Sequence, residues 1–147
     1  MRAVVTRVNS AAVAVGGVEK AAIGKGLLAL LGVGETDGEA EADKLADKLC
    51  GLRIFEDENG KMNVSPADAG AELLIISQFT LFADCRSRRP GFSRAARPER
   101  AEPLYERVVA DCRARGFTVG TGEFGAYMLV RSENDGPVTI LLDTQEL

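Results

Sequence analysis

The stretch LLIISQFTLF, residues 73–82, gives the strongest strand signal in the chain. It opens with four large apolar residues, and a short apolar run of this kind is typical of a strand buried in the core. We predict one strand over residues 73–82. Its second half carries Ser77, Gln78 and Thr80, and polar side chains in a core strand must be hydrogen-bonded or functional.

Two amphipathic helices are predicted, one before this strand and one after it. The first begins at a capping box formed by Thr36 and Glu39. The second has Pro103 in its first turn and ends at Gly116. Each helix has an apolar stripe at helical spacing. The stripes are Ala42, Leu45, Ala46, Leu49 and Cys50 in the first helix, and Ala101, Leu104, Tyr105, Val108 and Cys112 in the second.

The remaining segments favour further strands. Residues 2–15 alternate like two antiparallel strands broken near Asn9-Ser10, and other strands are expected at 27–33, 52–55, 127–131 and 138–142. The resulting order β-β-β-α-β-β-α-β-β has too few βαβ units for a doubly wound sheet. The sequence therefore predicts an α+β fold, with residues 1–147 as a single compact layered domain (β/β/α) of mostly antiparallel strands and two main helices.

Residue usage excludes several kinds of chemistry. The chain has no histidine, so Ser-His-Asp catalysis, Cys-His catalysis and histidine metal ligation are impossible. Cys50, Cys85 and Cys112 form no CxxC pair and indicate a reduced cytosolic protein rather than a zinc site or a disulfide framework. No apolar run reaches the roughly 18 residues of a membrane span. We expect a cytoplasmic protein with no metal, no other cofactor and no place in a membrane.

Charge is unevenly distributed along the chain. The net charge is −4, yet residues 84–100 contain six arginines and only two acidic residues. A basic loop on an acidic body fits one local contact with phosphate, and it fits a solvated surface loop equally well. Charge alone leaves both interpretations open. The arginines are Arg86, Arg88, Arg89, Arg94, Arg97 and Arg100.

Three features outside this loop are candidates for a site. Thr80 could be a nucleophile, but the chain offers no histidine to activate it, and backbone amides at the strand end could instead stabilise an oxyanion. Gly136-Pro137 marks a tight turn, for which a trans peptide bond is the default. Arg7 lies in an apolar strand, where alternation favours solvent unless the side chain braces a polar site.

Two motifs carry a resemblance to a known family. Ser77-Gln78-Phe79-Thr80-Leu81 and Asn134-Asp135-Gly136-Pro137-Val138-Thr139 resemble the two signature motifs of the D-aminoacyl-tRNA deacylase family, also known as D-Tyr-tRNA deacylases. Flanking segments are similar in the same order, at residues 1–8, 52–57, 60–63, 101–106 and 124–126. The resemblance covers nearly the whole chain.

This resemblance implies a hydrolase that releases the D-amino acid from D-aminoacyl-tRNA, accepts glycyl-tRNA and rejects L-aminoacyl-tRNA. It implies a homodimer in which a cis Gly136-Pro137 reaches into the partner's site. The carbonyl groups of this dipeptide would hold the substrate α-amino group and block an L side chain. Backbone amides near Phe79 and Thr80 would stabilise the oxyanion, and the 2′-hydroxyl of the terminal adenosine would help position the attacking water.

The resemblance also assigns roles to the other site residues. Ser77 and Gln78 would bind substrate, and Gln78 would brace the cross-subunit turn together with Arg7. Phe124, Gly125 and Met128 would form the pocket for the terminal adenine. The tRNA backbone would be bound by the arginine-rich loop, through Arg86, Arg88, Arg89, Arg94 and Arg97.

The chain departs from the family pattern at two places. Residues 85–92 lack a lysine and carry additional arginine, and Tyr127 stands where an acidic residue is common. Both changes bear on RNA affinity and substrate range. Two alternative functions stay open: a non-catalytic nucleic-acid-binding module of the same fold, and a hydrolase of unrelated esters with Thr80 as nucleophile.

Overall fold

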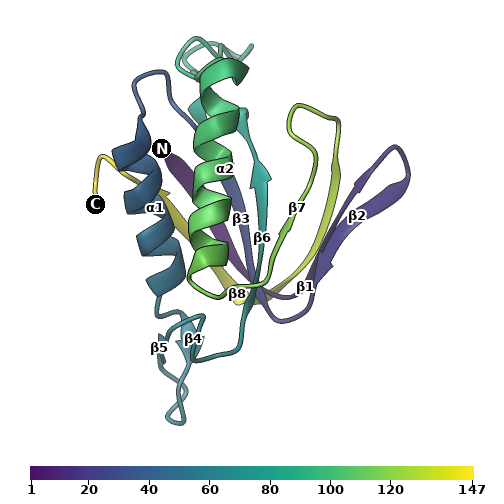
Figure 1. Ribbon diagram of the computed structural model, residues 1–147, viewed down its shortest axis with the longest axis vertical. Helices are drawn as coiled ribbons and strands as arrows, with labels where there is room; N and C mark the ends of the chain where they lie inside the picture. Colours follow the sequence, from purple (N-terminus) through teal and green to yellow (C-terminus); the bar gives the residue numbers. More distant parts are fainter.

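One long strand, β1 (Arg2–Val15), organises the sheet in the computed structural model, which describes residues 1–147 (Figure 1). It pairs antiparallel with three strands, β2, β3 and β8. Beyond β3 the sheet continues in parallel through β6 and β7. These five strands span Val18–Ile23 (β2), Gly26–Gly32 (β3), Glu72–Ser77 (β6), Val119–Thr121 (β7) and Leu129–Asp143 (β8).

The expected break in β1 near Asn9 and Ser10 is wrong. The strand runs through both residues, and the chain reverses later, at Gly16 and Gly17, whose φ angles of 57° and 79° suit glycine. Both polar residues are exposed, and the pairing of β1 with β8 shifts register on either side of Val8. The polar pair therefore marks an irregularity in the pairing rather than a turn.

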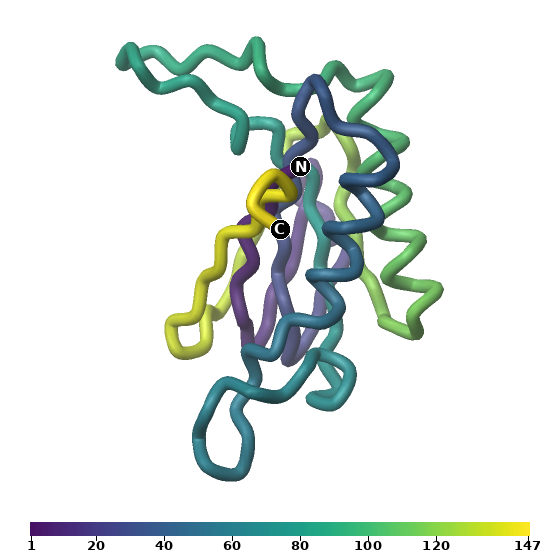
Figure 2. The backbone as a smooth tube through the Cα atoms, turned by 90° about the vertical axis from the view of Figure 1, so that its left-hand side faces the viewer, coloured from purple at the N-terminus to yellow at the C-terminus, as the bar shows by residue number.

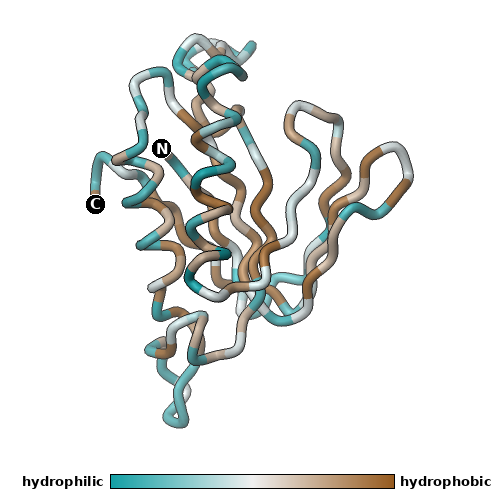
Figure 3. Tube along the Cα trace, viewed as in Figure 1, coloured by the Kyte–Doolittle hydropathy of each residue, from teal (hydrophilic) through white to brown (hydrophobic).

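Two helices, α1 (Glu39–Gly51) and α2 (Pro98–Ala114), pack side by side on one face of the sheet (Figure 1). All ten predicted stripe residues are buried, so the helical periodicity is confirmed. They form the main core with the strand residues that face them, among them Leu31, Leu73 and Ile75. In Figure 3 the central strands are hydrophobic, while hydrophilic residues recur along both helices.

The predicted helix starts are wrong in detail. Thr36 lies in a turn in which the Asp37 N–H donates to the Gly34 carbonyl at 3.1 Å, so α1 begins only after Gly38. The Glu41 carboxylate accepts the Gly38 N–H at 2.8 Å, and this hydrogen bond holds the pKa of Glu41 below its usual value. In α2 the first position is taken by Pro98, which has the φ that a helix start needs.

Pro103 consequently falls inside α2 and not in its first turn as predicted. The two prolines are five residues apart, and only one of them can occupy the first turn. Position 98 is favoured because it directly follows Arg97, which is extended at φ −69° and ψ 156°, as residues before proline prefer. The predicted end of the helix at Gly116, whose φ is 95°, is confirmed.

The sheet curls so that β2 lies over β6 and β7. A Cβ built on Gly120 of β7 would stand 3.1 Å from Ala21 Cβ of β2 and 3.2 Å from Leu74 Cδ1 of β6. A second apolar cluster fills the space between these strands on the face away from the helices. The domain therefore has three layers: the curled outer strands, the central strands and the two helices. This confirms the predicted α+β fold with its β/β/α layers and mostly antiparallel pairing.

The predicted strand over residues 73–82 is too long. β6 ends at Ser77, and Phe79–Phe82 form a 3-10 helix, η1. The last ladder contact is the Gln78 N–H donating to Leu31 O at 2.7 Å, because the neighbouring strand β3 ends at Gly32. A Cβ on Gly32 would come within 2.9 Å of Gln78 O, so only glycine lets η1 fold across the end of β3.

Other strand boundaries also differ from the prediction. The strand expected at 52–55 is the short β4 (Phe55–Glu56), paired with β5 (Met62–Val64), which the sequence did not indicate. The two closing strands are one element, β8, because both pair with β1. Between Asn134, opposite Val8, and Thr139, opposite Thr6, the chain leaves the ladder as a short turn.

Candidate functional site

The first component of the site is the start of η1. Its first internal hydrogen bond is donated by Leu81 to Gln78 O, at 3.3 Å. The amides of Phe79 and Thr80 precede that donor, so the turn leaves them available to a bound group. Beside them, Gln78 Nε2 donates to Thr80 Oγ1 at 2.5 Å. No histidine, free carboxylate or amine stands in this pair to act as a base.

The second component is a pocket of about 600 Å³ that begins at this strand end. It lies between the end of β6, η1, the start of α2 and the β7–β8 loop, and its lining is mostly apolar. A volume of this size suits a ligand as large as a nucleoside. The lining includes six predicted site residues, Ser77, Gln78, Phe79, Phe124, Gly125 and Met128, and one predicted tRNA-binding residue, Arg97. Thr80 is not part of it.

The far wall of the pocket is shaped by a close contact that the sequence did not reveal. A Cβ on Gly122 would stand 2.4 Å from Met128 Sδ, so a glycine here allows Met128 to fold back against the strand. Phe124 packs against Tyr105 of α2, with ring centroids 6.0 Å apart. The Tyr105 hydroxyl donates to Ile75 O at 2.6 Å, and burial raises the pKa of Tyr105 to about 12.

The third component is the turn that carries Gly136-Pro137, whose peptide bond is cis. Arg7 lies beneath this turn, only 5% exposed, which contradicts its expected place in solvent. Its guanidinium donates to Asp135 O at 3.2 Å and to Ile54 O at 2.8 Å, and it forms an ion pair with the Asp135 carboxylate at 3.2 Å. These acceptors satisfy a buried arginine, so strand alternation did not predict its environment.

Space around Gly136 is tightly restricted. Its φ is 130°, and a Cβ there would meet Val138 Cγ2 at 2.7 Å and Arg7 Nη2 at 3.2 Å. Asn134 Oδ1 accepts the Val138 N–H at 3.1 Å and closes the turn. The turn is therefore fixed from below by Arg7 and from within by Asn134.

This turn does not reach the pocket of its own chain. Neither Gly136 nor Pro137 lines the pocket, and neither does Arg7. In the β1–β3 register Arg7 stands opposite Leu27, whereas the pocket begins at Leu31, four residues further along β3. At about 3.3 Å per residue the two lie about 13 Å apart along the strand. The structure brings together the predicted pocket residues but not the turn and the pocket.

The arginine-rich segment forms an arm that projects from the end of the molecule where η1 and α2 begin (Figure 2). Asp84 and Gly91 pair through two backbone hydrogen bonds of 2.8 and 2.9 Å, which fold the arm as a hairpin. All five predicted tRNA-binding arginines are exposed. Arg86 forms an ion pair with Asp84, which holds the pKa of the Asp84 carboxyl below its usual range.

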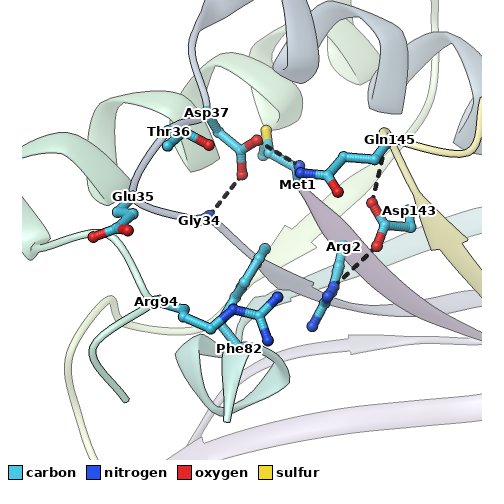
Figure 4. Close-up of a pocket in the computed structure, with 10 residues that line it drawn as sticks. All are labelled: Met1, Arg2, Gly34, Glu35, Thr36, Asp37, Phe82, Arg94, Asp143 and Gln145. Carbon is cyan, nitrogen blue, oxygen red and sulfur yellow. Dashed lines mark hydrogen bonds and ion pairs between the residues drawn. The ribbon is translucent and has the colours of Figure 1, made fainter. Parts of the chain in front are cut away.

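A second, smaller cavity of about 100 Å³ lies on the other side of η1 (Figure 4). Its charged groups are largely paired with one another: the Met1 amino group with Asp37 at 2.8 Å, and Arg2 with Asp143 at 3.0 Å. Arg94 extends into this cavity from the arm. Because its charges are mutually compensated and its volume is small, we place the functional site in the larger pocket.

No three or more histidine, cysteine, aspartate or glutamate side chains are grouped so that they could hold a metal ion. Neither α1 nor α2 has the length and hydrophobicity of a membrane-spanning helix. The fold and the site together define a class of small α+β proteins in which free backbone amides border an apolar pocket. Comparison with known proteins identifies the family.

The chain belongs to the D-Tyr-tRNA(Tyr) deacylase family, whose model matches residues 4–143. It is 57% identical over 147 residues to the D-aminoacyl-tRNA deacylases of Clostridioides difficile (strain 630), covering 99% of both chains, and of Symbiobacterium thermophilum, covering 99% of this chain and 97% of that protein. The resemblance noted in the two sequence motifs is thereby confirmed.

Solved structures agree with this assignment of the fold. A c-Myc DNA unwinding element binding protein superimposes with a TM-score of 0.92 at 42% identity, covering 97% of this chain and 98% of the other. A probable eukaryotic D-amino acid tRNA deacylase superimposes with a TM-score of 0.81 at 16% identity, covering 96% and 97%. The second likeness shows the fold alone.

Proposed function

We propose that this protein hydrolyses the ester bond between a D-amino acid and tRNA, and that it works in the cytoplasm. One observation carries the proposal: in a chain of this family, a pocket of nucleoside size ends at Phe79, the first residue of η1, whose amide and that of Thr80 precede the first internal hydrogen bond of that turn. The terminal adenosine would lie against Phe124, Gly125 and Met128. The ester carbonyl would then face η1.

The reaction would depend on backbone groups and on the substrate more than on side chains. Water attacks the ester carbonyl carbon, and the amides of Phe79 and Thr80 donate hydrogen bonds to the oxyanion that forms. The bond to the ribose oxygen then breaks, and that oxygen takes up the proton released by water. The neighbouring 2′-hydroxyl positions the attacking water. An aminoacyl ester is already activated, so orientation and electrostatic stabilisation suffice.

Chirality would be selected by a second copy of the chain. The Gly136-Pro137 turn does not line its own pocket, and Arg7, which holds the turn, stands about 13 Å along the strand from the start of that pocket, which fits a role of the turn in the partner's pocket. There the carbonyl oxygens of Gly136 and Pro137 would accept hydrogen bonds from the substrate α-amino group and exclude an L side chain. A D side chain points elsewhere, and glycine has none, so both D-aminoacyl-tRNA and glycyl-tRNA would be hydrolysed.

An exposed apolar face supports the dimer. Leu141 of β8 is 79% exposed and stands opposite Val4 of β1, which in turn stands opposite Leu30 of β3. These three residues lie on the face of the sheet that the helices leave open. A second copy on this face would bury Leu141. Replacing Leu141 with arginine should give a monomer by sedimentation and abolish deacylation, whereas a dimeric, active variant would contradict the model.

A second candidate is a non-catalytic nucleic-acid-binding module. It is favoured by the likeness, at 42% identity, to a protein named for binding a DNA unwinding element, and by the exposed arginine arm. Such a module needs the arm but not Gly136-Pro137. Release of amino acid from matched D- and L-tyrosyl-tRNA separates the two candidates. Release of the D form alone supports the deacylase, and binding of tRNA without release supports the module.

A further inference from the structure

The exposed aromatic rings of this chain are gathered at one place. Among six phenylalanines and two tyrosines, three are more than a third exposed: Phe79 at 56%, Phe92 at 39% and Tyr127 at 92%. All three line the large pocket. They come from separate segments, namely η1, the arginine arm and the β7–β8 loop. Single exposed apolar residues are common on proteins, but their concentration around one pocket indicates a binding surface.

Two of these rings are already in contact. Phe79 and Phe92 meet edge to face, with centroids 5.1 Å apart and planes at 73°. This contact fixes the base of the arm against η1. Tyr127 differs from them, because neither its ring nor its hydroxyl has an interaction partner within the chain. Its backbone is nevertheless defined by a turn in which the Ala126 N–H donates to Glu123 O at 3.2 Å, next to Gly125 at φ 77°.

The charge of the pocket complements these rings. Arg97 is the one charged side chain in its lining, and Arg86, Arg88 and Arg89 lie further out, in the part of the arm between the paired residues Asp84 and Gly91. Exposed aromatic rings beside arginines are the pattern that single-stranded nucleic acid recognises: bases stack on the rings, and phosphates pair with the cations. An apolar peptide would use neither the arginine nor a fully exposed phenol.

We propose that Tyr127 is a stacking platform for the base that precedes the terminal adenosine of the tRNA 3′ end. The inference rests on the proposed function, in which the terminal adenosine fills the part of the pocket formed by Phe124 and Met128. The preceding nucleotide then stands at the pocket mouth, where Tyr127 offers a free ring. Its phosphate lies on the side of Arg97. Tyr127 is thus a binding residue for tRNA and makes no contact with the ester.

Fluorescence tests the stacking without depending on hydrolysis. A short single-stranded RNA ending in the tRNA 3′ sequence, with 2-aminopurine as its penultimate base, should lose fluorescence on binding the wild-type protein. Tyr127→Phe keeps the ring and should keep the quenching. Tyr127→Leu should lose it while the RNA still binds through the arm. Val18→Ala, another exposed apolar position outside the pocket lining, serves as the control. Equal quenching by the leucine variant would overturn the proposal.

Kinetics separate this inference from the deacylase proposal. Tyr127→Leu should lower kcat/KM for D-aminoacyl-tRNA about tenfold, the size expected for one stacked base, and leave D-aminoacyl-adenosine unaffected because that substrate lacks the preceding base. An equal loss on both substrates would place Tyr127 in the adenosine pocket instead and refute the platform. A wild-type protein that hydrolyses neither substrate but still shows ring-dependent quenching would refute the deacylase alone.

Discussion

The Gln78 side-chain amide donates a hydrogen bond to the Thr80 hydroxyl oxygen at 2.5 Å, beside the free amides of η1. A catalytic nucleophile needs a partner that accepts its proton, and here the partner is a donor. This pairing argues against Thr80 as the nucleophile. It instead fixes the conformation of the residues whose backbone borders the pocket.

Thr80→Val should therefore keep most of the activity. Valine preserves the shape and the backbone amide and removes only the hydroxyl oxygen, so single-turnover deacylation should fall by no more than about tenfold. Intact-mass analysis should find no acyl group on the protein during turnover. A loss of several thousandfold with the fold intact would restore Thr80 as the nucleophile.

The oxyanion role of the η1 amides has a direct test in Phe79→Pro. Proline removes one N–H and is tolerated at the first position of a helix, which Phe79 occupies. Activity should fall by about 10²–10³, the usual cost of losing one such donor. Phe79→Ala is the matched control, since it loses the same ring but retains the amide. Equal activities of the two variants would exclude the Phe79 amide from catalysis.

The arginine arm should make tRNA binding sensitive to salt. Each phosphate contact contributes close to one unit to the slope of log affinity against log salt concentration. Replacing Arg86, Arg88, Arg89, Arg94 and Arg97 with serine should flatten that slope and leave the preference for D over L unchanged. Arg131→Ser, which removes an exposed arginine of β8, provides the control. An unchanged slope in the five-fold variant would mean that the arm is only a solvated surface.

Mixed dimers test whether Gly136 acts in the partner's pocket. Gly136→Ala should abolish activity, because the new Cβ would lie 2.7 Å from Val138 Cγ2. A subunit carrying Gly136→Ala paired with one carrying Phe79→Pro has one site built from two intact halves. Activity should return to about half of the wild-type value, although both parent homodimers are inactive. Confirmed heterodimers without recovery would show that each subunit builds its own site.

Tyr105→Phe should lower stability and change its dependence on pH. The variant leaves Ile75 O without the hydroxyl that donates to it at 2.6 Å, which costs about 1 kcal/mol. Burial raises the pKa of Tyr105 to about 12, above the ordinary tyrosine value of 10.0, so the unfolded chain loses this proton first. Wild-type stability should fall as pH rises from 10 to 12, and part of that fall should be missing in the variant. If the free energy of unfolding of the wild type and of the variant changed equally with pH between 10 and 12, the raised pKa of Tyr105 would be contradicted.

Helix positions were predictable from the sequence because each stripe repeats over several turns and directly reports burial. The ends of the helices and strands were not predictable, because they depend on contacts with residues that are distant in the sequence. β6 stops at Ser77 because β3 stops at Gly32, and a single-sequence pattern contains no information on that pairing. The short strands β5 and β7, of three residues each, carry too little alternation to be detected.

The pocket residues were predictable only through their resemblance to a family. The same resemblance predicted Arg7 as a brace of the Gly136 turn, in agreement with its contacts to Asp135, whereas the solvent environment that strand alternation favoured for Arg7 is wrong. Alternation in β1 suggested that the Arg7 side chain points to solvent. In the folded chain its hydrogen-bond acceptors are the backbone carbonyl groups of Ile54 and Asp135, which are distant in sequence. Tyr127 appeared only as a departure from the family pattern, and Phe92 only as the last residue of the altered segment 85–92. Their common position at the pocket mouth depends on three segments meeting in space.

β1 sets the spacing between the two halves of the proposed site. Near its start Arg2 donates to Leu81 O of η1 at 3.0 Å, and further along Arg7 holds the turn of Gly136. Inserting or deleting one residue between them would turn every following side chain to the opposite face of the sheet. Length can vary in the arginine arm or in the β4–β5 hairpin, which lie outside this segment (Figure 2). In the proposed two-fold dimer the same spacing along β1 would apply to both sites. Substrate range could then change through substitution of side chains, but not through a change in the length of β1.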